Sequence, residues 1–161
     1  MLTANKEIIM ALRHYAILRR RVTAPVIATL ALAALPAWAD APADYEQAVV
    51  GKWRLTAALD GADVTSLDEK EAQRLVGRVF TIRRDAITFG DRKCGPSEFE
   101  AESVEPRMFV REQFHADAAK LHLPSPVTVV DLSCTSVFIK NAVTLVIAWK
   151  GWFFDAVRVK R

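Results

Sequence analysis

Residues 51–59, GKWRLTAAL, form the segment from which the architecture of this chain can be argued. Apolar side chains occupy every second position and polar ones stand between them: Trp53, Leu55, Ala57 and Leu59 against Lys52, Arg54 and Thr56. Such an alternation is typical of a β-strand with one buried face and one solvated face. Asp60-Gly61 follows with the composition of a turn. The segment therefore predicts a half-buried strand that ends at a turn.

Seven further segments have the pattern of short strands, separated by turns such as the two-residue hairpin loop Lys150-Gly151. They are residues 79–82, 86–89, 98–103, 107–114, 127–134, 142–149 and 152–159. Strands this short and closely spaced most simply close on themselves, because closure removes exposed edges. The sequence predicts an all-β fold with one short helix, an antiparallel up-and-down eight-stranded β-barrel in a single domain over 47–161. An open sandwich is the alternative.

The one helix is expected between the first two strands, over about ten residues ending at Val76. Ser66 and Glu69 have the spacing of a capping box, and Gly77 stands in the position of a C-terminal cap. Leu75 and Val76 belong to a narrow apolar stripe. The helix is therefore predicted to lie on an apolar surface.

The first 39 residues have the composition of an export signal. Arginines at 13 and 19–21 precede an uncharged apolar run at 24–35, and small residues stand at the cleavage positions before Asp40. The run is about twelve residues, shorter than the roughly 20 of a membrane-spanning helix. We expect a signal peptide over 1–39, cleaved after Ala39, and a flexible lead-in over 40–46. A retained anchor is the alternative, and the chain starts at Met1 or Met10.

This leader accounts for the basic charge of the chain. The 161 residues carry 22 basic and 19 acidic side chains, a formal charge of +3. Residues 1–39 contain five of the basic residues and one of the acidic ones, so the remaining 122 residues have a net charge of −1. Nucleic-acid binding relies on surplus positive charge. The composition therefore argues against a nucleic-acid partner.

Cys94 and Cys134 are the two cysteines of the chain. In an exported protein, two cysteines permit one intramolecular disulfide. Closing the loop between them would stabilise the fold by about 4 kcal/mol in the loop-closure model. A redox-active pair normally has a much shorter spacing. The sequence therefore predicts a structural disulfide in a periplasmic or secreted protein.

Gly51 and Trp53 in the first strand, together with Arg158 near the end of the last, resemble the signature of the lipocalins and their calycin relatives. The resemblance implies that the Trp53 indole packs beneath the barrel and that Arg158 lies across it, where cation–π attraction stabilises the pair. It covers two short places in the chain. In size the chain is similar to small secreted bacterial barrels, including the periplasmic metalloprotease inhibitors and the streptavidin-like proteins.

Catalytic motifs are missing from the sequence: it has no nucleophile elbow, no phosphate-binding glycine loop and no zincin motif. His115 and His122, with Asp117 between them, would need a third ligand nearby to hold a metal ion. Two exposed loop histidines are the simpler interpretation. We therefore expect no catalytic activity, no metal and no cofactor.

Aromatic residues around the Lys150-Gly151 turn, with two residues of the helix, form a candidate surface for a ligand or a partner: Trp149, Trp152, Phe153, Phe154, Leu75 and Val76. A ligand role requires an open interior, whereas a small barrel can equally be filled by its own side chains. The favoured function is an exported, monomeric binding protein that holds a small hydrophobic ligand, with the helix as a lid.

An acidic run at residues 98–105 carries the alternative function. It would dock a cationic partner if the protein were a periplasmic inhibitor or an envelope interaction module. The simpler interpretation pairs these acids with the basic residues at 78–93 across the solvent faces of neighbouring strands.

Overall fold

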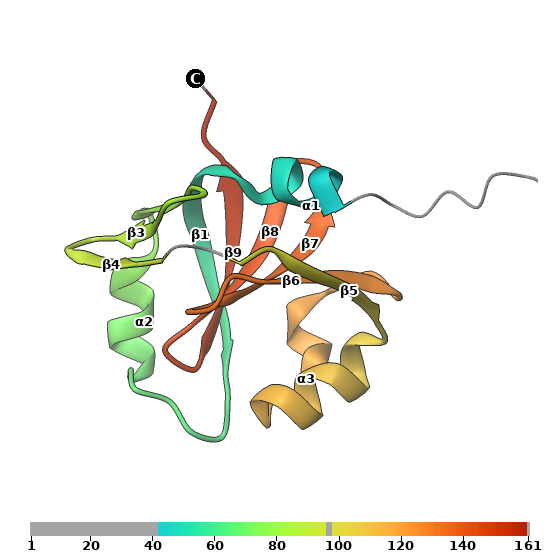
Figure 1. Cartoon of the computed structure of the whole chain (residues 1–161). Helices are drawn as coiled ribbons and strands as arrows, with labels where there is room; N and C mark the ends of the chain where they lie inside the picture. The colour runs from blue at the N-terminus through green and yellow to red at the C-terminus, as the bar shows by residue number, and fades with distance from the viewer. Residues whose placement is uncertain (1–41, 96–97, 161) are drawn as a thin grey trace, which may run out of the picture. The chain divides into compact units, whose positions relative to one another are not determined.

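The computed structural model describes residues 42–95 and 98–160, and the predicted signal peptide lies outside this range. Figure 1 shows the described residues as a curled antiparallel sheet with helices packed around it. The helices are α1 (Pro42–Val49), α2 (Glu69–Leu75), α3 (Pro106–Phe114) and the 3-10 helix η1 (Ala118–Leu121). The strands are β1 (Gly51–Gly61), β2 (Val79–Ile82), β3 (Ile87–Phe89), β4 (Arg92–Cys94), β5 (Glu100–Val104), β6 (Val127–Asp131), β7 (Ser136–Asn141), β8 (Thr144–Trp149) and β9 (Trp152–Arg158).

The sheet follows the up-and-down order expected of a barrel, but it is not closed. Its strand order is β4-β3-β2-β1-β9-β8-β7-β6-β5, and every ladder is antiparallel. The first and last strands pair with each other, with Trp53 opposite Arg158. In the described residues the missing ladder is the one between β4 and β5. The mostly-β antiparallel fold is thus confirmed as a nine-stranded curled half-barrel, whereas an eight-stranded closed barrel is not.

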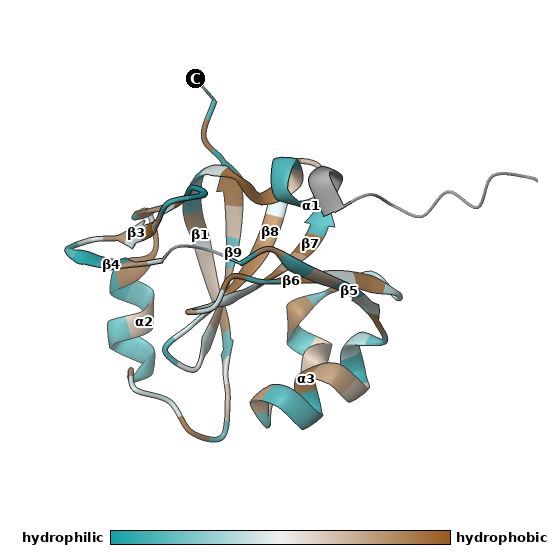
Figure 2. Ribbon diagram, viewed as in Figure 1, coloured by the Kyte–Doolittle hydropathy of each residue, from teal (hydrophilic) through white to brown (hydrophobic). Residues whose placement is uncertain are grey.

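Two apolar layers stabilise this sheet. The inner layer fills its concave side with large buried side chains, among them Trp53, Phe80 and Phe154. The outer layer lies between the convex side of β6–β9 and the segment containing α3 and η1, and Phe138 and Phe153 are its largest members. In Figure 2 strand β8 is mostly coloured hydrophobic, whereas α2 is mostly hydrophilic, as expected for a helix with one buried face.

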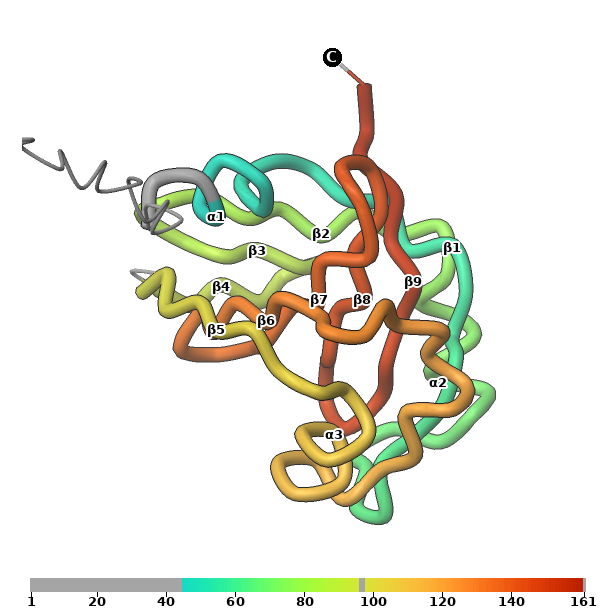
Figure 3. The backbone as a smooth tube through the Cα atoms, turned by 90° about the vertical axis from the view of Figure 1, so that its right-hand side faces the viewer, coloured from blue at the N-terminus to red at the C-terminus, as the bar shows by residue number. Residues whose placement is uncertain are grey.

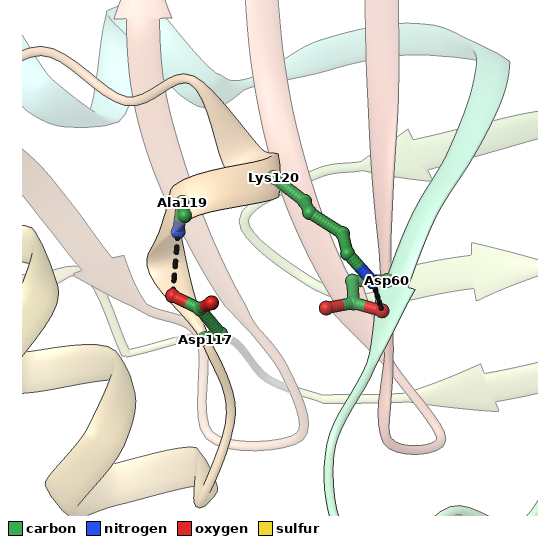
Figure 4. Close-up of polar contacts among 4 residues, drawn as sticks. All are labelled: Asp60, Asp117, Ala119 and Lys120. Atoms are coloured by element: carbon green, nitrogen blue, oxygen red, sulfur yellow. Dashed lines mark hydrogen bonds and ion pairs between the residues drawn. The ribbon is translucent and has the colours of Figure 1, made fainter.

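Helix η1 is fixed at both ends (Figure 4). The Asp117 carboxylate accepts a hydrogen bond of 2.9 Å from the Ala119 backbone N–H and so caps the helix. Lys120 Nζ lies 3.1 Å from Asp60 Oδ1, at the far end of β1. Figure 3 shows α3 and the following segment gathered at one end of the sheet, away from α1. The outer layer therefore covers one part of the convex side and leaves the remainder exposed.

The prediction of a strand over 107–114 is wrong, because these residues form helix α3. The Glu105 side chain accepts a hydrogen bond from the Met108 N–H, Pro106 occupies the first turn, and His115 ends the helix in the left-handed conformation. Proline at the first turn lacks only an N–H that would be unpaired there anyway. Val110 is fully buried against the sheet. Phe109, Val110 and Phe114 thus face the outer layer with helical spacing, whereas Met108 is exposed.

Of the eight predicted strands, seven remain once residues 107–114 are assigned to α3. Two further strands, which were not predicted, bring the total in the described residues to nine. Residues 92–94 form β4 and residues 136–141 form β7, and no strand was predicted at 92–94 or over the whole of 136–141. A tight turn interrupts the predicted strand 127–134: Ser133 has φ +70°, and its N–H donates to the Asp131 carboxylate. Residues 142 and 143 likewise lie in the β7–β8 turn instead of at the start of β8.

The helix predicted between the first two strands is present as α2, but its N-terminal cap differs from the prediction. The capping box consists of Asp68 and Glu71, not Ser66 and Glu69. The reason is that Ser66 is held by the β8–β9 hairpin, where its N–H donates to Lys150 O. Gly77 follows the helix with φ +88°, and its N–H donates to Leu55 O, which returns the chain to β1.

The lead-in predicted over 40–46 is helical from Pro42 onward, as part of α1, while residues 40 and 41 lie outside the described residues. Glu46 and the buried Val49 connect this helix to the body of the fold.

Candidate functional site

The end of the half-barrel beneath α1 is organised by Trp53 and Arg158. The Arg158 guanidinium carbon lies 4.3 Å from the centre of the Trp53 ring. Its Nη1 donates to Val50 O at 2.9 Å, and its Nη2 donates to Ala48 O. The Trp53 indole N–H donates to Val49 O at 2.7 Å. These contacts fasten the carbonyl end of α1 to the end of the sheet, because cations and N–H donors satisfy the last carbonyls of a helix.

Gly51 makes room for this arrangement. Its φ of +153° is a conformation that favours glycine, and a Cβ built on it would lie 2.7 Å from Arg158 Nη1. A side chain at position 51 would therefore displace the guanidinium. Arg158 thus stacks on Trp53 at one end of the sheet, and Gly51 leaves the space that the guanidinium occupies.

A cleft of about 600 Å³ opens beside this end, between the β2–β3 turn and the C-terminal residues that follow β9. Val50 and Val159 are its accessible apolar side chains, and Gly51, Thr81 and the fully buried Ile82 complete the lining near β1 and β2. Its cationic residues are Lys52, Arg83, Arg158 and Lys160. A volume of this size falls within the range of about 300–1,000 Å³ that is typical of small-molecule sites.

The positive charges near this cleft are balanced to different degrees. Arg84, on the β2–β3 turn, donates a hydrogen bond to Glu46 of α1, and that bond and the carboxylate charge raise the pKa of the guanidinium. Arg83 forms an ion pair with Asp85, with 3.4 Å between Nε and Oδ1. Arg158 by contrast contacts carbonyl oxygens and an aromatic ring, and no described carboxylate pairs with it. The cleft therefore combines aliphatic side chains with an excess of positive charge.

The aromatic residues predicted as a ligand or partner surface are packed into the fold. Phe153 and Phe154 are buried on opposite sides of the sheet, in the outer and the inner layer. Trp149 is half-buried and makes edge contacts with Phe80 and Phe89, at 5.4 and 5.7 Å between ring centres. The concave side of the half-barrel is thus filled by its own side chains, and a hollow of about 310 Å³ beside the Lys150-Gly151 turn is lined in part by Phe114, Trp149 and Phe153.

The remaining candidates of that surface connect the β8–β9 hairpin to α2. The Trp152 indole N–H donates to Leu67 O at 2.8 Å, just before the helix. Leu75 is half-buried and packs against the inner layer, and Val76 is half-buried at the end of the helix. Ala72 of the same helix is fully buried. Helix α2 is accordingly packed on the sheet as part of the wall of the core.

The histidines occupy two helix ends. His115 and His122 are exposed and adopt left-handed conformations after α3 and η1. Asp117 uses its carboxylate to cap η1. Within residues 42–95 and 98–160, no group of three or more metal-ligating side chains is close enough to hold an ion. The structure therefore gives these residues a conformational role.

Cys94 and Cys134 form a disulfide, with 6.5 Å between their Cα atoms. The bond joins the end of β4 to the turn between β6 and β7. It therefore spans the gap between the two edges of the sheet, where no hydrogen-bonded ladder is present among the described residues.

The acidic run does not pair with the basic strands as the simpler interpretation expected. Glu98, Glu100 and Glu102 are exposed, and none of them forms an ion pair with another described residue. Glu105 uses its side chain to cap α3. The separation has a topological cause, since basic β4 and acidic β5 are opposite edges of the sheet and not neighbours.

No protein-family model, no curated protein and no solved structure matches this chain. Among the helices of the described residues, none combines the length and the apolar character that a membrane crossing requires.

Sequence reasoning missed most of the cleft. Lys52, Thr81, Ile82 and Lys160 were assigned to strand faces or left without a role, although Gly51 and Arg158 were singled out beside them. The available signal was the resemblance itself, because it brings the start of the first strand next to the end of the last. The basic residues at both of those places could then have been placed together.

Proposed function

We propose that this protein is an exported, non-catalytic binding protein that holds a small, largely apolar molecule in the cleft beside Arg158. The observation that carries the proposal is the cleft itself, which at about 600 Å³ exceeds the hollow of about 310 Å³ beside the Lys150-Gly151 turn and is flanked by the aliphatic side chains of Val50 and Val159. We further propose that the half-barrel is of calycin type and acts as a monomer. The contact between Trp53 and Arg158 supports that kinship.

Export is the second part of the proposal. The disulfide between Cys94 and Cys134 supports an oxidising compartment, since such bonds persist mainly outside the cytosol. The basic and apolar segments of residues 1–39 support a cleaved signal peptide. Mass spectrometry of the protein recovered after expression tests this part, and a first residue other than Asp40 would contradict the cleavage site.

Titration with a neutral apolar probe, 1-octanol, tests the ligand site. We expect saturable shifts in the amide NMR signals of the residues that line the cleft. In Thr81→Phe the larger side chain would fill the cleft, so binding should weaken by at least tenfold, about 1.4 kcal/mol. Thr88→Phe is the matched control, because Thr88 pairs with Thr81 across β2 and β3 and is half-buried but does not line the cleft. Absence of saturable binding to the unmodified protein would overturn the proposal.

A second candidate function is docking of a cationic protein partner on β5. Its support is that Glu98, Glu100 and Glu102 are exposed on an edge of the sheet and carry no ion pair within the described residues. Affinity capture from a periplasmic extract at low and at physiological salt tests it, with Glu100→Gln/Glu102→Gln as the comparison. A partner retained equally by both proteins would contradict docking on β5.

A further inference from the structure

The charges around the cleft identify the chemical class of its ligand. We infer that the cleft selects an aliphatic molecule with an acidic head group, such as a carboxylate or a phosphate monoester. The inference rests on the proposed function, because it concerns the same cleft. It adds which end of the molecule is recognised and by which residues.

Three cations of the cleft have no carboxylate partner among the described residues. Lys52 and Lys160 are exposed, and their side chains form no hydrogen bond or ion pair there. The half-buried Arg158 forms no ion pair with a described acidic residue, although two of its N–H groups are occupied by carbonyl oxygens. A charge that is held at a partly apolar surface without a counter-ion attracts an anion more strongly than a fully solvated one. The cleft therefore favours a negatively charged ligand over a neutral one.

The walls of the cleft determine what else the ligand carries. Val50 and Val159 are half-buried and present aliphatic surface to the cleft, whereas the side chain of Ile82 is fully buried. Aliphatic side chains contribute about 25 cal/mol for each Å² of apolar surface that a ligand removes from water. The lining contains no aromatic residue on which a nucleobase or sugar ring would stack. An aliphatic tail beside an acidic head matches this combination of walls and charges.

The cationic residues of the cleft have two different roles: one holds the fold in place, and the others can bind the head group of the ligand. Arg158 holds α1 and Trp53, so its substitution would perturb the fold as well as the cleft. Lys52 lies on β1, and Lys160 lies on the segment that follows β9. The two segments are joined there by a hydrogen bond of 2.8 Å from the Val159 N–H to Lys52 O. Both lysine side chains are free to reach a head group without loss of a contact within the described residues. They are therefore the recognition residues that can be tested.

The test compares decanoate with decanamide, which have the same chain and differ in head-group charge. Affinities are measured by NMR titration of the protein as isolated, below the concentrations at which decanoate forms micelles. We expect decanoate to bind at least about tenfold more tightly, and this preference to shrink at high salt, because screening weakens exposed charge pairs. Decyl phosphate forms a third arm that reports whether a carboxylate or a phosphate head binds more tightly.

Variants assign the preference to the lysines. Lys52→Gln and Lys160→Gln should each weaken decanoate binding by about two- to fivefold and leave decanamide binding unchanged, as expected for partly exposed charge pairs. Lys70→Gln is the matched control, since Lys70 is an exposed lysine of α2 outside the cleft. Equal affinity of decanoate and decanamide would overturn this inference and leave the proposed function intact. Saturable binding of neither probe would overturn both.

Discussion

Strands β1 and β8 belong to the same sheet but have different surroundings. In β1, Trp53 and Leu55 are buried, while Lys52 and Arg54, which alternate with them, are exposed. In β8, three consecutive residues, Leu145, Val146 and Ile147, are fully buried. The cause is the outer layer, because α3 and η1 cover the convex side of β6–β8 but reach β1 only at its far end, near Leu59 and Asp60, and leave the start of β1 in contact with water. A strand alternates in sequence where one face is covered, and it becomes continuously apolar where both are.

The comparison assigns the largest stability effect to the inner layer of the β1 region, which has no outer layer to support it. Trp53→Ala should lower the free energy of unfolding by about 3–5 kcal/mol, because it empties a fully buried site and leaves Arg158 without its aromatic partner. Urea unfolding followed by circular dichroism measures the loss, and Trp53→Phe should lose less. A loss below about 1 kcal/mol for Trp53→Ala would show that this region is stabilised from elsewhere.

The disulfide joins the two regions that the comparison separates. The double variant Cys94→Ala/Cys134→Ala should lose about 2–4 kcal/mol, since the bond closes a loop with a sequence separation of 40 residues. Thermal unfolding with and without reductant provides the control. The reductant should lower the melting temperature of the unmodified protein and leave that of the double variant unchanged. An unmodified protein that is insensitive to reductant would contradict a stabilising bond.

Two valines on the convex side compare the regions directly. Val129 is 2% exposed beneath the outer layer, and Val79 is 36% exposed on β2. Val129→Ala should cost about 2 kcal/mol, from two buried methylene equivalents and the cavity they leave. Val79→Ala should cost less than about 0.5 kcal/mol, as is usual at the surface. Equal costs in chemical denaturation would mean that the two convex surfaces do not differ in burial in solution.

The smallest expected effect concerns α2, which packs on the inner side of β1. Asp68→Ala should lower the free energy of unfolding by about 1 kcal/mol, because its carboxylate caps the helix through the Glu71 N–H. Ser66→Ala should change it by less than about 0.5 kcal/mol, since the backbone N–H and not the hydroxyl of Ser66 contacts the hairpin. A larger loss for Ser66→Ala than for Asp68→Ala would contradict the Asp68 cap and support the Ser66 cap that the sequence predicts.

The sequence predicted the fold well where strands have one covered face and less well where the outer layer is involved. Strand β1, the hairpins β2–β3 and β8–β9 and the presence of α2 could be predicted, because local alternation and turn residues specify them. Helix α3 was predicted as a strand, because its apolar residues serve a tertiary layer that no local pattern reveals. Its Glu105-Pro106 start was the available signal, since an acidic cap followed by proline is typical of a helix N-terminus.

The candidate site was predictable only in part. Gly51, Trp53 and Arg158 were recognised because they form a short signature, and the structure brings them together at one end of the sheet. The cleft beside them depends on the pairing of the first strand with the last and on the direction of the C-terminal residues. Those are long-range features, and residues such as Ile82 and Lys160 carry no local sign of them.

The gap between β4 and β5 has a consequence for the connectivity of the chain. Every pair of strands that is consecutive in sequence is also paired in the sheet, apart from β4 and β5, and the β1–β9 ladder joins the first strand of the chain to the last. Helix α1 and the C-terminal residues lie at the same end of the sheet, as Figure 1 shows. A circular permutant that begins at β5 and ends at β4, with a linker from Lys160 to Pro42, would preserve all the strand pairings and place its new termini at the two natural edges.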